Sequence, residues 1–205
     1  MVDLSSLPSD ITPENFFTEV LPEVLGDVEL PSDLGTERMQ FNITGDGGAS
    51  YHIGIDSDGD LTIEEGQASA PPIAVSTSME AFRSILGGDL RDRILGATGA
   101  VMIGPKQLRK AFMPDAKVQK VKAIKGDVQI RIEDGGDVTA VTTTFGGGTP
   151  NTSTPVCRVS IGVPSILEIA QKKANPQQLF MQGKIRIEGD MNIVFQLMGI
   201  LSAPN

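Results

Sequence analysis

The chain contains the same residue pattern twice, at a spacing too long for a simple repeat array. Residues 73–85 match residues 157–169, with Val75 opposite Val159, an offset of 84 residues (159 − 75). The same offset places residues 99–104 over residues 183–188. Upstream, residues 53–62 match residues 130–139 at an offset of 77 residues (130 − 53). Matching blocks in one order indicate an internal duplication, and a period of this length predicts two small related units rather than a solenoid.

Helix and strand signals alternate in both halves. Thr12-Pro13 and Asn175-Pro176 each combine a capping residue with a proline at the first helical position. In the first half, hydrophobic periodicity predicts a helix ending near Gly26, strands near 41–43, 51–55, 61–63 and 73–76, helices at 79–86 and 90–95, and a strand at 100–103. In the second half it predicts strands near 128–132, 138–143 and 156–161, a helix at 164–172, a helix from 176, and a strand at 184–188. This alternation is typical of an α+β fold.

Composition excludes several classes of site. The only cysteine, Cys157, rules out an internal disulfide and a multi-cysteine zinc site, and the only histidine, His52, argues against a histidine-based metal centre or charge relay. Cys157 lies in a predicted strand and is interpreted as a small buried hydrophobe rather than a nucleophile. No catalytic constellation is visible in the sequence, so we expect no enzymatic activity and no cofactor. No secretory leader and no apolar run of ~20 residues are present, which predicts a cytoplasmic location.

Charge is unevenly distributed along the chain. The net charge of −9 argues against nucleic acid as a partner, and residues 1–36 contain eight acidic residues and no lysine or arginine. Seven of the 17 basic residues fall between positions 106 and 125. This stretch is either a solvated linker between the two copies or a surface for an anionic membrane or an acidic partner. Its basic residues are Lys106, Arg109, Lys110, Lys117, Lys120, Lys122 and Lys125.

Two segments resemble ligand-binding loops but lack the required residues. Residues 56–60 have the composition of a calcium loop, yet the first ligand position falls on Gly54, so we interpret the segment as an acidic turn. Residues 99–106 approach the spacing of a phosphate-binding loop. Their four spacer residues form a predicted strand and Pro105 precedes the lysine, so the backbone amides could not surround a phosphate.

The carboxyl-terminal sequence is similar to a known family. Residues 175–191 read NPQQLFMQGKIRIEGDM and closely resemble the end of the sterol-carrier-protein (non-specific lipid-transfer, sterol carrier protein type 2) family. That family ends with a short helix, Gly-Lys, an alternating strand, Gly-Asp or Gly-Asn, and an apolar helix. Residues 14–22 resemble its first helix and residues 55–61 its strand–turn–strand region. The resemblance covers most of residues 12–201 and suggests a tandem or duplicated version.

The resemblance implies a specific fold and domain division. We expect an α+β protein of two related sterol-carrier-like units, each a roughly five-stranded sheet covered on one face by helices that enclose a lipid tunnel. Residues 1–11 would be an amino-terminal tail, 12–115 the first unit with its amino-terminal helix, and 116–205 the second unit with an apolar carboxyl-terminal helix.

The last predicted helix, residues 190–201, is the main candidate for a ligand contact. It is apolar on nearly every side, so it is either buried on all sides as a core helix serving both copies or borders something apolar that is not protein. Methionines adapt to varied apolar ligands. The second alternative, with the resemblance, predicts non-enzymatic binding and transfer of an apolar lipid, such as a sterol or a fatty acyl chain. The alternative is a structural or interaction protein with a fully packed duplicated fold. The predicted lipid-contacting residues are Phe180, Met181, Met191, Ile193, Val194, Phe195, Leu197, Met198, Ile166 and Ile169.

Overall fold

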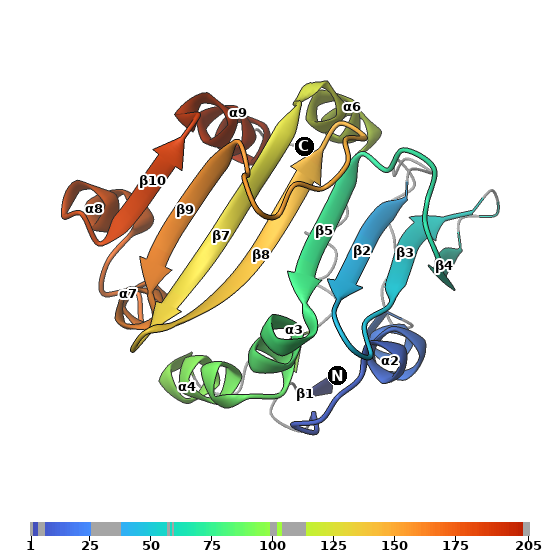
Figure 1. The fold of residues 1–205 in the computed structure, drawn as a ribbon, viewed down its shortest axis with the longest axis horizontal. Helices are drawn as coiled ribbons and strands as arrows, with labels where there is room; N and C mark the ends of the chain where they lie inside the picture. The colour runs from blue at the N-terminus through green and yellow to red at the C-terminus, as the bar shows by residue number, and fades with distance from the viewer. Residues whose placement is uncertain are drawn as a thin grey trace.

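The chain forms two sheets and several helices (Figure 1). The computed structural model describes residues 2–3, 7–25, 38–56, 58, 60–98, 102–103 and 114–202. The strands are β1 (Val2–Asp3), β2 (Met39–Thr44), β3 (Ser50–Ile55), β4 (Leu61–Glu65), β5 (Ile73–Ser78), β6 (Met102–Ile103), β7 (Gly126–Asp134), β8 (Asp137–Phe145), β9 (Cys157–Gly162) and β10 (Ile185–Gly189). The helices are α1 (Pro13–Asn15), the π-helical turn η2 (Phe16–Val20), α2 (Leu21–Leu25), α3 (Met79–Leu86), α4 (Asp89–Thr98), α6 (Asp115–Ala123), α7 (Val163–Ala170), α8 (Pro176–Met181) and α9 (Met191–Ser202).

The predicted helix starts at Thr12 and Asn175 are confirmed. The Thr12 hydroxyl accepts a hydrogen bond from the backbone N–H of Asn15 (3.1 Å), and Pro13 follows the cap. Asn175 and Gln178 form a reciprocal capping box at the start of α8. The first helix widens into a π-helical turn just before Pro22, which cannot donate a backbone hydrogen bond.

Strands from both halves form one sheet, in the order β10-β9-β7-β8-β5-β2-β3-β4. Each half contributes a hairpin and a strand parallel to the first arm of that hairpin: β5 lies parallel to β2, and β9 lies parallel to β7. The halves meet where β5 pairs antiparallel with β8. The prediction of two separate sheets of about five strands is therefore wrong. In two separate sheets, β5 and β8 would each be an edge strand with unpaired backbone N–H and C=O groups. Pairing with each other satisfies these groups, so the two halves form one sheet.

The two segments matched at an offset of 84 residues fold into the same sequence of elements. β5 and β9 each span six residues, and α3 and α7 each span eight. A second helix and a strand follow in both, as the offset predicts. The last strands are placed differently, because β10 pairs with β9 whereas β6 pairs with β1 in a separate two-stranded sheet. An origin by duplication and a division at residue 115 stay predictions.

The match at an offset of 77 residues pairs the wrong hairpins. It aligns β3–β4 with β7–β8, and both are hairpins. However, β7 borders the parallel strand β9, and in the first half the strand that borders β5 is β2. The counterpart of β7–β8 by topology is therefore β2–β3. Acidic turns at both hairpin tips produced the sequence match.

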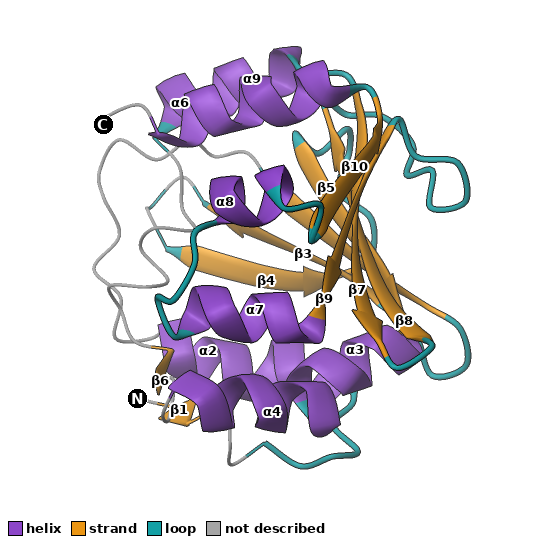
Figure 2. Ribbon diagram, turned by 90° about the vertical axis from the view of Figure 1, so that its left-hand side faces the viewer, coloured by secondary structure: helices purple, strands orange, loops and turns teal. Residues whose placement is uncertain are grey.

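One face of the large sheet is apolar and packs against the helices (Figure 2). Its first core, in the first half, contains Leu7, Ile11, Phe17, Ile43, Tyr51, Met79 and Phe82. Its second core, shared by β5 and the second half, contains Ile73, Val121, Ile124, Val128, Phe145, Cys157 and Ile193. Side chains alternate between the two faces of a strand, so the strand residues of both cores lie on one face.

The opposite face is polar, and among the described residues no helix covers it; Figure 1 looks onto this face. Its buried polar side chains are Gln40, His52, Ser76, Asp127, Gln129, Thr142, Thr144 and Ser160. Several of them bond to each other: the Thr144 hydroxyl donates to the Asp127 carboxylate, and Gln129 Nε2 donates to the Thr142 hydroxyl (3.1 Å). These bonds satisfy polar groups that would otherwise be costly to bury.

Two glycines with nearly equal φ angles test how closely the chain packs beside the second core. Gly146 follows β8 with φ of +70°, and Gly183 follows α8 with φ of +71°. A Cβ at Gly146 would collide with the carbonyl oxygen of Ile124, whereas nothing lies within 4 Å of a Cβ at Gly183. We expect Gly183→Ala to lower the free energy of unfolding by about 1 kcal/mol, from the left-handed backbone alone. Gly146→Ala should lower it clearly more, as measured by urea denaturation; equal losses would contradict the close packing.

The Cys157 thiol provides a pH-dependent test of the second core. It is fully buried, and burial first and the Asp190 carboxylate second raise its pKa above the usual value. We expect the native protein to react with a thiol reagent at pH 8 far more slowly than the unfolded chain.

Because the folded pKa of Cys157 is raised, this thiol contributes stability that is present below the usual thiol pKa and is lost as pH rises above it. Urea denaturation between pH 7 and 10 should show a larger loss for the wild type than for Cys157→Ala; equal losses would contradict the raised pKa.

Candidate functional site

A row of apolar side chains crosses the helix-facing side of the sheet in the second half. Ile130 on β7 lies in register with Val141 on β8 and with Val159 on β9, and Val159 lies in register with Ile187 on β10. We call these four residues the apolar row. Ile130 is 46% exposed, and the other three are half-buried. An exposed isoleucine in the middle of a sheet face is unusual, because such positions normally lie in the core.

The row is incompletely covered because the helices pack on either side of it. On one side, α6 and α9 cover the neighbouring row, in which Val128 is 8% exposed and Cys157 is fully buried. On the other side, α7 packs against β7 and β9. Figure 2 shows α6 and α9 at one end of the sheet and α7 toward the other, with the short helix α8 between them. The two helix groups leave an apolar strip of sheet partly open to solvent.

The helix α9 has two different apolar sides. Ile193 is 4% exposed and belongs to the second core, and Val194, Leu197 and Ile200 pack against the same core. Phe195 is 57% exposed, and Met198 is 60% exposed. The alternative in which this helix is buried on all sides is therefore wrong. One side closes the second core, and the other presents apolar side chains outward.

The remaining predicted contact residues lie around the same half of the sheet. On α8, Phe180 is 41% exposed and Met181 is 80% exposed, and the buried side of this helix is formed by Leu179. Met191, at the start of α9, is half-buried, as are Ile166 and Ile169 on α7. The structure places the ten predicted residues on three helices, α7, α8 and α9, and their contact with a ligand stays a prediction.

The apolar row was not predicted as a site, although the sequence contains a signal for it. Ile130 and Val159 alternate with polar residues at period two, which marks one face of each strand as apolar. The missing information was which helices would cover which part of that face. Periodicity along one strand shows the orientation of a side chain and does not show its cover.

The polar side chains of the described residues do not form a metal site. No group of three or more histidine, cysteine or acidic side chains could hold a metal ion in the part of the chain that the structure describes. The Asp56 carboxylate accepts hydrogen bonds from the backbone N–H groups of Asp58 and Asp60 (both 2.9 Å), so it caps its own turn. The segment 99–106 lies mostly outside the described residues, as do 57 and 59 of the acidic turn. The Cys157 thiol is buried, and burial raises its pKa, which agrees with its interpretation as a core residue.

The basic stretch is described only in part. Lys106, Arg109 and Lys110 lie outside the described residues. Lys117, Lys120 and Lys122 lie on α6, which packs against α9. Lys125 donates to the carbonyl oxygen of Gly146 (2.6 Å), so it also fixes the turn after β8. Contact of this stretch with an anionic membrane or an acidic partner stays a prediction. Within the described ranges, no helix has the length and apolar character that crossing a bilayer requires.

Comparisons with known proteins relate the second half to one family. Residues 106–202 match the model of the SCP-2 sterol transfer family. No curated protein matches the chain.

Several solved structures are similar to part of the chain. Sterol carrier protein 2 like 2 from Aedes aegypti is 21% identical, with 54% of this chain and 91% of that protein covered and a TM-score of 0.33. Sterol carrier protein 2 from Yarrowia lipolytica, in its apo form, is 18% identical, with 54% and 84% covered and a TM-score of 0.30. Sterol carrier protein domain 2 of Helicoverpa armigera is 22% identical, with 42% and 72% covered and a TM-score of 0.30. The family match spans α6 to α9 and includes the apolar row, so the resemblance of the carboxyl-terminal sequence to this family is confirmed for residues 106–202.

Proposed function

We propose that the chain binds an apolar lipid, such as a sterol or a fatty acyl chain, on the helix-facing side of the sheet and transfers it without chemical change. The observation that carries the proposal is the apolar row, which is partly exposed within the segment that matches the SCP-2 sterol transfer family. A hydrocarbon laid along this row would remove apolar surface from water on both partners. Burial of each methylene group contributes about 0.8 kcal/mol.

The helices that flank the row suit a ligand of variable shape. Phe195 and Met198 on α9, and Phe180 and Met181 on α8, present flexible or flat apolar side chains at their exposed positions. Methionine side chains adapt to irregular apolar partners, and ligand sites are mostly apolar with few polar groups. We propose that these helices move relative to the sheet when lipid enters, so that their exposed residues become covered.

We propose the second half as the binding unit because aromatic rings pack closely against each other in the first core. In the first core, the rings of Phe17 and Tyr51 stack with centroids 4.5 Å apart. Phe41 adds a tilted contact to Phe17 at 5.3 Å, and Phe16 bridges Phe17 to Phe82 by edge contacts of 5.2 and 5.8 Å. Among the described residues, the second core contains one aromatic ring, that of Phe145. We propose that the two halves are related units, that aromatic rings fill the first, and that the second keeps space for a lipid.

A pair of matched substitutions tests the binding surface. Ile130 is 46% exposed on the apolar face, and Val138 is 44% exposed on the polar face of the same hairpin. Ile130→Gln should weaken binding of a fluorescent fatty acid or sterol by about tenfold, since it replaces a contact worth roughly 1.5 kcal/mol. Val138→Gln should leave the affinity unchanged. Neither change should lower the melting temperature by more than a few degrees, because both positions are half open to solvent.

Equal affinity of both variants and the wild type would contradict the proposed surface. Mass spectrometry of an organic extract from the freshly purified protein is the independent control for the function itself. Absence of any bound lipid, together with no uptake of added fatty acid or sterol, would favour the alternative of a structural or interaction protein.

A second test separates the two sides of α9. Ile193→Ala removes a 4% exposed side chain from the second core and should lower the free energy of unfolding by about 2–5 kcal/mol. Phe195→Ala changes a 57% exposed side chain and should lower it by less than about 1 kcal/mol. If the outward side of α9 contacts lipid, Phe195→Ala should nevertheless reduce lipid uptake. Unchanged uptake in a stably folded Phe195→Ala protein would remove this residue from the site.

A further inference from the structure

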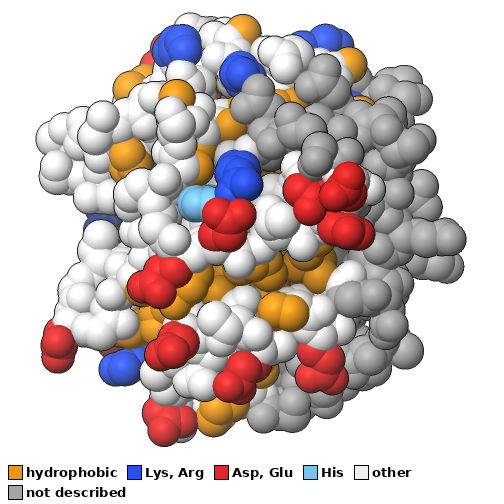
Figure 3. All heavy atoms as spheres, turned by 90° about the vertical axis from the view of Figure 1, so that its right-hand side faces the viewer, with side chains coloured by type: hydrophobic (Ala, Val, Ile, Leu, Met, Phe, Trp, Pro, Cys, Tyr) orange, Lys and Arg blue, Asp and Glu red, His pale blue; other side chains and the backbone are white. Residues whose placement is uncertain are grey.

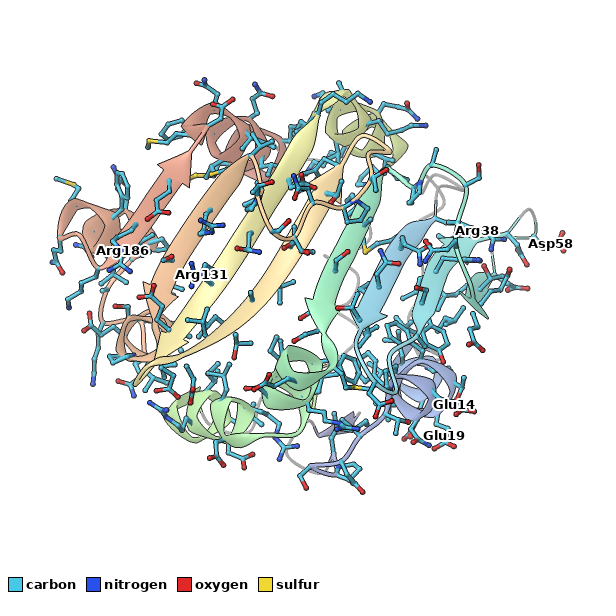
Figure 4. The ribbon with its side chains drawn as sticks, viewed as in Figure 1. Glu14, Glu19, Arg38, Asp58, Arg131 and Arg186 are labelled. Carbon is cyan, nitrogen blue, oxygen red and sulfur yellow. The ribbon has the colours of Figure 1, made fainter. Side chains whose placement is uncertain are left out.

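The polar face of the sheet carries a cluster of three arginines around a buried serine. Ser160 on β9 lies in register with Arg131 on β7 and with Arg186 on β10. Arg158 lies two residues before Ser160 on the same strand and therefore on the same face. The hydrogen bond from Arg158 to Gln129, which precedes Arg131 by two residues, confirms that both strands present these side chains to one side. Figure 4 shows Arg131 and Arg186 on either side of β9, on the face opposite to the helices.

Two of the arginines have partners, and the third has none among the described residues. Arg186 Nη2 donates to both carboxylate oxygens of Glu133 (2.8 and 2.9 Å), which leaves its Nε and Nη1 without an acceptor there. Arg158 Nε donates to Gln129 Oε1 (3.0 Å), and its Nη1 lies 3.6 Å from the Glu188 carboxylate. Within the described part of the chain, the half-buried Arg131 makes no hydrogen bond or ion pair. An arginine offers five donors in a planar fork, so this cluster has more donors than acceptors.

The serine at the centre of the cluster also lacks a partner. Ser160 is 5% exposed, and its hydroxyl makes no hydrogen bond among the described residues. Among the described residues no fully buried side-chain oxygen or nitrogen lacks a partner, so the Ser160 hydroxyl still reaches solvent and is accessible to a solute on this face. Neighbouring strands are about 4.8 Å apart, so Arg131 and Arg186 rise from the sheet about 10 Å apart with the Ser160 hydroxyl between them. Three donors therefore surround one point above β9.

The charge around this point favours an anion although the chain as a whole is acidic. Three arginines and the two glutamates Glu133 and Glu188 leave one positive charge in the cluster. Other acidic side chains lie at the other end of the sheet: Figure 3 shows acidic residues around the β4 edge, and Figure 4 places Glu14, Glu19 and Asp58 there. The Arg186–Glu133 pair is exposed, and exposed pairs are weak and can rearrange.

We infer that Arg131, Arg186 and Ser160 bind a phosphate group on the polar face of the sheet. A phosphate accepts hydrogen bonds from several directions, which matches a hydroxyl below and guanidinium groups on two sides. A carboxylate is planar and would satisfy one arginine fork, leaving the hydroxyl or the second arginine without an acceptor. The phosphate belongs either to a free phosphorylated molecule or to the headgroup of an anionic phospholipid. The site lies on the face opposite to the apolar row, so it does not depend on the proposed lipid binding.

The test is a titration of the full chain with inorganic phosphate, followed by NMR of backbone amides and arginine side chains at fixed pH and ionic strength. We expect shifts confined to Arg131, Ser160, Arg186 and their strand neighbours, and at least tenfold weaker binding in Arg131→Gln. The matched control is Arg83→Gln, which removes the same charge from an exposed position on α3. Acetate serves as the carboxylate control. Arg131 bonds to no described residue, so its variant should fold, and its melting temperature checks this.

Each outcome decides the proposal. Confined shifts that Arg131→Gln weakens and Arg83→Gln leaves unchanged support it. Absence of shifts, unchanged shifts in Arg131→Gln, or equal weakening by both variants would overturn it, because only general charge attraction would remain. Equal affinity for acetate would overturn the assignment to phosphate. Sedimentation with phosphatidic acid vesicles and with phosphatidylcholine vesicles then distinguishes the sources: binding to the former that requires Arg131 indicates a lipid headgroup, and its absence indicates a free phosphorylated molecule.

Discussion

The antiparallel pairing of β5 with β8 is the interaction on which the rest of the structure depends. It joins strands from both halves into one sheet, with Ile73 opposite Phe145 at one end and Thr77 opposite Val141 at the other. The Thr77 hydroxyl also donates to the carbonyl oxygen of Ala140 (2.9 Å). Because a sheet has only two faces, this junction makes all eight strands share one apolar and one polar side. The second core uses that continuity, since it combines Ile73 of the first half with Val128 and Cys157 of the second.

The two faces divide the proposed activities of the protein. On the helix-facing side, the apolar row lies between helix groups that do not cover it completely, and a lipid would complete the burial. On the other side, the side-chain hydrogen bonds of Asp127, Gln129 and Thr142 satisfy their own polar groups, whereas Ser160 and Arg131 lack partners among the described residues. A shift of register by one residue would exchange the two sides of a strand, so both surfaces depend on the same pairing.

Local structure could be predicted from the sequence, and the long-range arrangement could not. The caps at Thr12 and Asn175, the period-two strands and the matched elements after β5 and β9 follow from nearest neighbours along the chain. The single sheet could not be predicted in this way, because pairing between β5 and β8 joins two strands that are far apart in sequence. The outward side of α9 was also missed in part: its composition predicts contact with something apolar, but only packing shows that Ile193 is core and Phe195 is not. The arginine cluster is invisible in the sequence, since three strands contribute to it.

The difference between the two cores links the two halves of the chain to the proposed function. A lipid-binding unit has to leave apolar surface unsatisfied until a ligand arrives, which lowers the stability of the unit on its own. In the first half, aromatic rings pack against each other between helices and sheet and add contacts that do not depend on a ligand. The shared sheet connects these contacts to the second half, whose strand β8 pairs with β5 over residues 141–145. A filled unit joined to an incompletely covered one would therefore keep the binding surface folded when it is empty, which a carrier requires between delivery and uptake.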